Sequence, residues 1–260
     1  YGTVAIIGGN KGMHGALFLA GRAALLAGAG KVVLGALDSD FKLDFSMPEL
    51  MSQSPKEIAR NLQAFDAIAI GPGLGQDDKA VKILDKLLDD IEDSKLLVDA
   101  DALNLIANNL ELKLKFREVR YKIITPHTGE AARILGVTVN EVQEDRFMSI
   151  TDISTKLNAV TILKGAGSLI QANSQIFVNT TGNPGLANAG QGDTLTGLIA
   201  AFLAQGMEML DATRLGVFVH GLAADRLVIQ KRGYNGILAS IVAEEASCVI
   251  NEMVYGNLFQ

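Results

Sequence analysis

The sequence predicts an α/β protein with a mainly parallel, doubly wound sheet, helices on both faces of the sheet and a late β-hairpin. Short runs that are apolar throughout, such as Ala67–Ile70, are typical of strands buried on both faces. Most of these runs are followed by a glycine-rich or polar turn and then by a helical pattern, which is the order of strand–helix–strand units. Long apolar helical patterns close the chain and are expected to cover one face of the sheet.

The individual elements are predicted in order along the chain. Strands are expected at residues 3–7, 31–37, 67–70, 96–98, 122–124 and 160–163. Helices are expected at residues 16–27, 81–91, 131–135 and 141–158, and one more begins within residues 99–104. Two β-rich runs, 168–172 and 175–178, are joined by Asn173-Ser174 and indicate the hairpin. Three closing helices are expected at residues 194–205, 211–231 and 238–255, whereas residues 38–55 show no clear period and are expected to be irregular.

The composition of the chain excludes several classes of partner. With 260 residues and 48% hydrophobic content the chain can bury one large core, so a single domain over residues 1–260 is expected. The formal net charge of -6 argues against a nucleic-acid partner, because phosphate backbones demand a basic face. The longest apolar stretches are interrupted by Arg22 and Lys31 and by Gln205 and Glu208, so we expect no membrane span.

The cysteine content and the start of the chain bear on its compartment. One cysteine, Cys248, excludes an internal disulfide and a multi-cysteine metal site, which favours a reducing, cytoplasmic compartment. Cys248 lies in an apolar helical pattern and is expected to be a buried, inert thiol. The chain begins at Tyr1 without Met and enters a strand pattern directly. This start favours a sequence cut from a longer protein and gives no sign of export.

The most informative stretch runs from Gly182 to Gly197, where a glycine-rich loop turns into a helix. Glycines let backbone N–H groups approach a ligand closely, and a helix start aims unpaired amides and the positive end of its dipole at the same point. This arrangement predicts an anion site, best suited to phosphate. Asp193 places a carboxylate there, where it either accepts a proton from a hydroxyl that is being phosphorylated or serves as the N-cap of the helix.

Polar residues also follow the predicted strands, where open α/β sheets bind their ligands. After strand 96–98, Asp99 is the better functional candidate and Asp101 is expected to be a helix N-cap. After strand 122–124, His127 and Glu130 are either functional or structural. A lone His is usually structural, and a carboxylate in the first turn of a helix is stabilised by the positive end of the helix dipole. Lys164 opens a Gly-x-Gly turn and is either a solvated strand end or, as we favour, part of a phosphate site.

The glycine-rich turn Gly8–Gly15 is also typical of ligand binding, but its spacing fits neither a dinucleotide fingerprint nor a P-loop. Taken together, the loops of this chain resemble those of the ADP/ATP-dependent NAD(P)H-hydrate dehydratases, which are relatives of ribokinase. This resemblance implies a ribokinase-like fold. The matching stretches cover nearly the whole chain and lie at residues 8–16, 28–32, 71–75, 99–104, 125–130, 163–168 and 182–197.

The resemblance implies a role for each matching position. Asp193 is implied to contact the substrate and to act on its hydroxyl as the catalytic residue. Further contacts to the hydrated nicotinamide dinucleotide are implied for Ala16, Gly73 and His127. The residues implied to bind the nucleotide are Lys164, Gly165, Ala166, Gly167, Ser168 and Gly192. Supporting roles fall to Asp99, Asn104 and Glu130, with Asp99 and Glu130 directed toward metal-bound water, and the direct metal ligands stay open.

The implied activity is that of a hydro-lyase in metabolite repair, which restores NAD(P)H from its hydrate. The ring hydroxyl is phosphorylated by ADP or ATP with Mg²⁺, and phosphate is then expelled with help from the lone pair of the ring nitrogen. ADP is the favoured donor, and a homotetramer is also implied. Two positions depart from the family pattern: Met13-His14 replaces a usual aromatic residue, which bears on substrate stacking, and Ala189 replaces a common glycine.

Two other interpretations remain open from the sequence. A kinase of the same fold, acting on a thiazole or hydroxymethylpyrimidine alcohol, shares the Gly-Asp start of the helix. His127 and the Gly71–Gly75 loop favour the dehydratase over that kinase. A non-catalytic nucleotide-binding sensor is the second alternative. The presence of Lys164, Gly192 and Asp193 together argues against it, because a sensor has no need of the proton acceptor.

Overall fold

The computed structural model describes residues 1–43 and 46–256. Its strands are β1 Thr3–Gly8, β2 Lys31–Ala36, β3 Met51–Ser52, β4 Ala67–Ile70, β5 Lys95–Val98, β6 Lys122–Ile124, β7 Val160–Leu163, β8 Leu169–Ala172 and β9 Gln175–Val178. Its α-helices are α1 His14–Leu26, α2 Pro55–Ala59, α3 Asp78–Asp90, α4 Ala100–Asn108, α5 Leu110–Glu118, α6 Thr128–Leu135, α7 Val139–Glu144, α8 Arg146–Leu157, α9 Gln191–Ala204, α10 Met209–Lys231 and α11 Ala239–Tyr255. Two short 3-10 helices are η1 Leu62–Ala64 and η2 Pro184–Leu186. Residues 44–45 and 257–260, which the predicted domain of residues 1–260 includes, lie outside the described residues.

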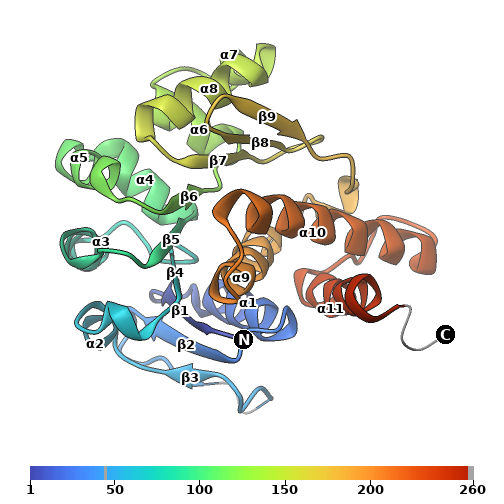
Figure 1. The fold of residues 1–260 in the computed structure, drawn as a ribbon, viewed down its shortest axis with the longest axis horizontal. Coiled ribbons are helices and arrows are strands. Elements are labelled where there is room, and N and C mark those ends of the chain that lie inside the picture. The colour runs from blue at the N-terminus through green and yellow to red at the C-terminus, as the bar shows by residue number, and fades with distance from the viewer. Residues whose placement is uncertain (44–45, 257–260) are drawn as a thin grey trace.

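The described strands form a nine-stranded sheet in the order β3-β2-β1-β4-β5-β6-β7-β8-β9 (Figure 1). Every neighbouring pair from β3 to β7 is parallel, whereas β7–β8 and β8–β9 are antiparallel. This topology confirms the predicted mainly parallel sheet with a late β-hairpin. Because the parallel strands all end at one edge of the sheet, the turns after β1, β4, β5, β6 and β7 gather at that edge.

Alternate side chains of the strands enter two separate hydrophobic cores. In β1, Val4 and Ile6 belong to the core shared with α1, α9, α10 and α11, whereas Ala5 and Ile7 belong to the core shared with α2 to α8. Figure 1 shows α3, α4 and α5 on one side of the sheet and α9, α10 and α11 on the other. The expected helices on both faces are therefore confirmed.

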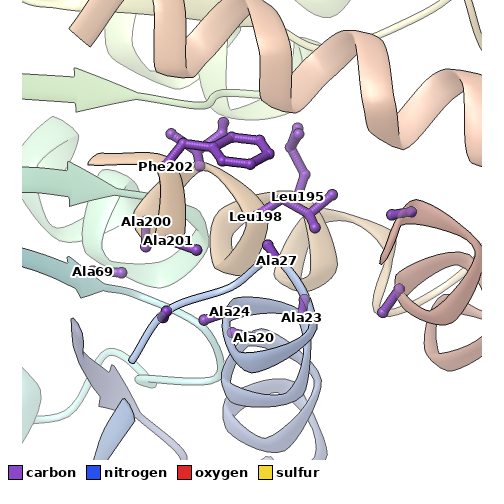
Figure 2. Close-up of a cluster of buried hydrophobic side chains, with 14 of the residues drawn as sticks. Ala20, Ala23, Ala24, Ala27, Ala69, Leu195, Leu198, Ala200, Ala201 and Phe202 are labelled. Atoms are coloured by element: carbon purple, nitrogen blue, oxygen red, sulfur yellow. The ribbon is translucent and has the colours of Figure 1, made fainter. Parts of the chain in front are cut away.

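Helix α9 lies against α1 through small side chains (Figure 2). Ala20, Ala23 and Ala24 of α1 are fully buried at this contact. Gly197 of α9 allows the closest approach, because an added Cβ would lie 2.1 Å from the carbonyl oxygen of Ala20 and 2.8 Å from the Cβ of Ala23. The contact fixes the body of α9, and with it the position of the first turn of that helix.

Several helices, α1, α3, α9 and α10, begin two or three residues earlier than predicted, and one predicted helix is divided. Helix α1 begins at His14, two residues before the predicted start at Ala16. The single helix expected over residues 141–158 is divided into α7 and α8 at Asp145. The backbone of Asp145 leaves the helical conformation, with φ of -139° and ψ of 86°, and its carboxylate accepts a hydrogen bond from the amide of Met148. Asp145 thus caps a new helix where a continuous one is predicted.

Three short elements, β3, α2 and α5, also lie where the sequence pattern predicts none. Residues 38–55 are less irregular than expected, because β3 pairs with β2 and α2 begins at Pro55. The hydroxyl of Ser54 accepts a bond from the amide of Glu57, whose carboxylate accepts one from the amide of Ser54. Helix α5 is likewise unpredicted. It is capped by the side-chain oxygen of Asn109 and buries only Leu112 and Phe116, which is too few apolar positions for a clear period.

Cys248 is exposed, so the expectation of a buried thiol is wrong. The buried stripe of α11 runs through Val242, Ala246 and Val249. Cys248 precedes Val249 by one residue and is therefore turned about 100° away from that stripe. In the described part of the chain, no helix combines the length and the apolar character needed to cross a membrane.

Replacing Gly197 by Ala is expected to destabilise the protein, because the added methyl group must displace the backbone of α1. Overpacking against a rigid neighbour costs about 3 kcal/mol, which exceeds the gain of about 1 kcal/mol in helix propensity. Urea unfolding should therefore show a loss of about 2 kcal/mol. The matched control is Gly15→Ala in α1, where the added carbon meets open space, and it should be neutral or stabilising. Equal stability of Gly197→Ala and the wild type would contradict the close α1–α9 approach.

Candidate active site

A buried ion pair lies at the centre of the candidate site. Asp99 follows β5 and Lys164 follows β7, and Lys164 Nζ lies 2.8 Å from Asp99 Oδ1. The hydroxyl of Thr196 in α9 donates to the other carboxylate oxygen, Asp99 Oδ2, at 2.9 Å. An added Cβ on Gly192 would lie 3.4 Å from Lys164 Nζ, so the start of α9 sits directly on the pair. The ends of two strands and the first turns of one helix therefore meet at a single charged contact.

Both members of this pair are charged. Burial by itself would raise the pKa of Asp99, but the Lys164 ammonium outweighs it and holds the pKa below its ordinary value. Burial would likewise lower the pKa of Lys164, but the negative charges of Asp99 and Glu130 raise it. A charge without its partner at this depth would be strongly unfavourable. Each of the two groups thus stabilises the ionised form of the other.

His127 and Glu130 cap helix α6 at the end of β6. Nδ1 of His127 accepts hydrogen bonds from the amides of Gly129 and Glu130, at 2.9 and 3.2 Å, and Glu130 Oε2 accepts one from the amide of His127 at 2.8 Å. Both residues thus have the structural role that the sequence left open. Glu130 Oε2 also lies 3.9 Å from Lys164 Nζ, so the cap borders the ion pair.

The ring of His127 is neutral and faces outward. Burial of part of the ring and the nearby charge of Lys164 lower the pKa of His127. Because Nδ1 accepts two bonds, the ring proton resides on Nε2, which lies 3.3 Å from Glu130 Oε1. Burial raises the pKa of Glu130. The side chain of His127 remains 57% exposed, so its outer edge is accessible to a ligand.

Asp193 is the third residue of α9 and is not its N-cap. Gly190 occupies the N-cap position with φ of 87°, so the helix begins earlier than Asp193 and the N-cap interpretation of Asp193 is wrong. Burial raises the pKa of Asp193 to about 7, the negative charge of Asp99 raises it further, and Lys164 opposes both. A carboxyl group that titrates near neutral pH is well suited to general acid–base catalysis.

The turn between β7 and β8 presents its backbone beside the pair. Gly165 and Gly167 have φ of 151° and 61°, which favours glycine at both positions. Arg146, at the start of α8, donates to the carbonyl oxygens of Ala166 and Leu163 at 2.6 and 3.2 Å. Arg146 therefore stabilises the turn by binding its backbone carbonyl groups. This role could not be predicted from the sequence, since residue 146 lies within the helix predicted over residues 141–158.

Ala16 and Gly73 meet at the other side of the site, where β1 and β4 adjoin. An added Cβ on Gly73 would lie 3.2 Å from the Cβ of Ala16 and 2.5 Å from the carbonyl oxygen of Met13. The strand order reverses between β1 and β4, and open α/β sheets bind ligands at such a point. The structure thus places these two predicted substrate contacts together.

Asp101 connects the loop after β4 with the part of the site around Asp193. Its carboxylate accepts a hydrogen bond from the amide of Gly75 at 2.9 Å, and its charge adds to the raised pKa of Asp193. The prediction that Asp101 is a helix N-cap is wrong, because Asp99 occupies that position and Asp101 lies in the first turn of α4. The early start of the helix frees the Asp101 carboxylate to hold the loop after β4.

A family model described as NAD(P)H-hydrate dehydratase matches residues 4–247. The chain belongs to the NAD(P)H-hydrate dehydratase family. It is 38% identical to the ADP-dependent (S)-NAD(P)H-hydrate dehydratase of Neisseria meningitidis, over 97% of this chain and 86% of that protein. It is 39% identical to the bifunctional NAD(P)H-hydrate repair enzyme of Coxiella burnetii over 96% of this chain, but spans only 51% of that protein.

A solved structure extends the match to the fold. The ADP/ATP-dependent NAD(P)H-hydrate dehydratase from Bacillus subtilis, co-crystallised with ATP and Mg²⁺ and soaked with CoA, aligns with a TM-score of 0.82 and 32% identity. The alignment covers 96% of this chain and 91% of that chain. The fold class expected from the sequence is therefore that of a solved NAD(P)H-hydrate dehydratase.

The remaining candidate of this family pattern, Asn104, lies on α4. Its side-chain oxygen accepts a hydrogen bond from Arg133 of α6. The charge of Arg133 also contributes to the lowered pKa of His127, after burial and Lys164. Asn104 is thus bonded to a cation whose charge reaches His127.

Two clefts lie away from these residues. One of about 530 Å³ lies between the β8–β9 hairpin and α10, and one of about 650 Å³ lies around Leu62, Phe65 and Lys95. Neither is lined by Asp99, Lys164 or Asp193. Neither cleft therefore marks the candidate site, which is identified by its charged residues Asp99, Lys164 and Asp193 and by the glycine-rich turns beside them.

Replacing Lys164 by Met should destabilise the protein by about 3–5 kcal/mol, because Asp99 is left buried without its partner. The double variant Lys164→Met/Asp99→Leu removes both charges and should recover most of that loss. Urea unfolding of the four proteins in this cycle measures the coupling. Lys115→Met is the matched control, since it breaks contacts to Asp85 and Asp89 that are more exposed to water, and it should cost about 1 kcal/mol or less. Equal losses for Lys164→Met and Lys115→Met would refute the central role of the pair.

Proposed function

We propose that this chain dehydrates the hydrated forms of NADH and NADPH, by phosphorylating the ring hydroxyl with a nucleotide and then eliminating phosphate. One observation carries the proposal. Asp193 combines a pKa of about 7 with a position in the first turn of α9, beside the Lys164–Asp99 pair. In a chain of the NAD(P)H-hydrate dehydratase family, a carboxylate so placed is suited to deprotonate a hydroxyl next to bound phosphate.

The first step is a phosphoryl transfer. Asp193 accepts the proton of the ring hydroxyl, and the hydroxyl oxygen attacks the terminal phosphorus of the nucleotide. The bond between that phosphorus and the bridging oxygen breaks, and the shortened nucleotide leaves with the bonding electrons. Lys164 and the amides of the first turn of α9 stabilise the charge on the transferring group. A helix start suits this role because its first amides have no partner within the helix. The first backbone bond here is from Thr194 N to Gly190 O.

The second step is an elimination. Phosphate departs from the ring carbon with the bonding electrons, while the lone pair of the ring nitrogen stabilises the cation that is left. Loss of a proton from the adjacent carbon then restores the ring double bond of NAD(P)H. The hydroxyl itself is a poor leaving group, so phosphorylation makes a dehydration possible at a kinase-like site.

The nucleotide is proposed to bind through Lys164 and its turn. Gly165, Ala166, Gly167 and Ser168 would contact its phosphates with their backbone groups, and Gly192 would add an amide from α9. The positive φ of Gly165 and Gly167 supports this role, since it favours glycine, and a turn without side chains lets a phosphate approach the backbone closely. ADP is the proposed donor, which the ADP-dependent name of the Neisseria meningitidis relative supports.

Mg²⁺ fits these residues as an ion held mainly by the nucleotide. Among residues 1–43 and 46–256, no group of three or more His, Cys, Asp or Glu side chains is placed to hold a metal ion. Mg²⁺ commonly takes one or two carboxylates, several waters and substrate phosphates. Asp99 and Glu130 are the two that would hold it, through water, since both border Lys164. When bound, the ion would neutralise charge on the phosphoryl group.

The hydrated dinucleotide is proposed to lie against Ala16, Gly73 and the exposed edge of His127. The contact between the loops of Ala16 and Gly73 supports a shared binding surface. Met13, 37% exposed beside this contact, would pack on the substrate where relatives usually have an aromatic residue. Asn104 has a supporting role through Arg133.

We further propose that residues 1–260 form one domain that assembles as a homotetramer in the cytoplasm. The continuous sheet from β3 to β9 supports one domain. The single cysteine supports a reducing compartment. The tetramer rests on the family resemblance and is tested by light scattering.

Recovery of NADH from its hydrate, measured at 340 nm with Mg²⁺ and with ADP, ATP or no nucleotide, tests the proposed function. Recovery should require one of the nucleotides. Asp193→Asn should lower turnover by about 10²–10⁴-fold, the range for loss of a general base. Asp211→Asn is the matched control, because Asp211 is an exposed first-turn carboxylate of α10, and it should keep wild-type turnover. Folded protein that recovers no NADH with either nucleotide, or full turnover by Asp193→Asn, would overturn the proposal.

A further inference from the structure

The glycine-rich loop before α9 is held by side chains from α10 and by the segment before α11. Asp225 of α10 accepts hydrogen bonds from the amide of Gly182 and from Asn183 Nδ2, at 2.9 and 2.8 Å. Farther along the loop, Asn188 Nδ2 donates to the carbonyl oxygens of Gly185 and Ile237, at 2.6 and 2.9 Å. These bonds anchor both halves of the loop to the helical layer that covers the sheet.

The two backbone carbonyl groups determine which side-chain atoms of this network donate and which accept. Because Asn188 Nδ2 faces carbonyl oxygens, Asn188 Oδ1 must be the acceptor for Gln191 Nε2, which lies 3.2 Å away. Gln191 Nε2 also donates to the carbonyl oxygen of Ile237 at 2.9 Å. The remaining amide oxygen, Gln191 Oε1, therefore faces Nε2 of His220 at 3.2 Å. His220 must carry a proton on Nε2 to complete the network.

The environment of His220 is suited to such a fixed donor. Gln191 and His220 are only 4% and 7% exposed. Burial lowers the pKa of His220 to about 4, with a smaller contribution from Lys164, so the ring is neutral at physiological pH. A buried amide oxygen without a donor is strongly disfavoured, and this oxygen belongs to the first residue of α9. Gly192 and Asp193 follow it directly in the chain.

We propose that His220, acting through Gln191, is a positioning residue that fixes the first turn of α9 and so aims the Gly192 amide and the Asp193 carboxylate. This inference rests on the proposed function of Asp193. Loss of the donor lets the Gln191 amide turn away to find another partner, and the first turn then loses its fixed orientation. Small displacements of a reacting group lower the rate strongly even when folding is preserved.

Three substitutions on α10 test the proposal. His220→Leu removes the donor and should lower kcat by about tenfold to a hundredfold at saturating nucleotide and substrate. His220→Gln retains an N–H that reaches the same acceptor and should keep kcat within about threefold of the wild type. Thr213→Val is the matched control, since Thr213 is buried on the same helix and its hydroxyl donates to the carbonyl oxygen of Met209 outside the network. It should leave kcat unchanged.

Amide hydrogen exchange of residues 182–193 gives a readout that does not depend on turnover. Exchange should be faster in His220→Leu than in the wild type, and unchanged in His220→Gln and Thr213→Val. If His220→Leu does not fold, Gln191→Leu tests the same link and should give the same loss of kcat. Wild-type kcat in a folded His220→Leu, or equal losses in His220→Leu and Thr213→Val, would overturn the positioning role. A wild-type protein inactive in the NADH-hydrate assay would instead refute the proposed function, and the exchange data would still test the positioning.

Discussion

The buried ion pair between Asp99 and Lys164 is the interaction on which the rest of the site depends. It joins the end of β5 to the end of β7, and the Thr196 hydroxyl adds α9 through the second carboxylate oxygen. Because Asp99 is fully buried and Lys164 is largely buried, losing Lys164 leaves the Asp99 charge uncompensated, so the three elements keep one arrangement. The pair also sets the local electrostatics: its carboxylate reinforces the effect of burial on the pKa of Asp193, while its ammonium limits the rise.

Helix α9 holds the Gly192 amide and the Asp193 carboxylate beside the ion pair, because the helix is fixed along its length. Its body packs on α1 through Gly197 and buried alanines, with no room for a larger residue. Near its start, Thr196 donates a hydrogen bond to Asp99 of the ion pair, and Gln191 is bonded to His220. The amides and carboxylate of its first turn thus occupy set positions, as electrostatic preorganisation requires. Arg146 has the same effect on the facing turn by binding its carbonyl groups.

The sequence predicts the strands well because apolar runs such as Ala67–Ile70 are buried on both faces, which leaves a continuous signal. It misses α2 and α5, which are short and bury few residues, and the break at Asp145, which depends on one local side-chain bond. The site is predictable as far as it follows strand ends and glycines. Arg146, Thr196 and His220 escape prediction because their partners lie on other elements of the chain, so only the fold brings them together.

The pH dependence of kcat/KM for nucleotide-driven recovery of NADH from its hydrate tests the account most directly. Asp193 must lose its proton to act as a base, and its pKa is raised to about 7, chiefly by burial. The value of kcat/KM should therefore rise as the pH passes through about 7 and level off above it. The residual activity of Asp193→Asn should lack this rise. A kcat/KM that is independent of pH between about 5 and 9, or a rise that persists in Asp193→Asn, would contradict the assignment of Asp193 as the base.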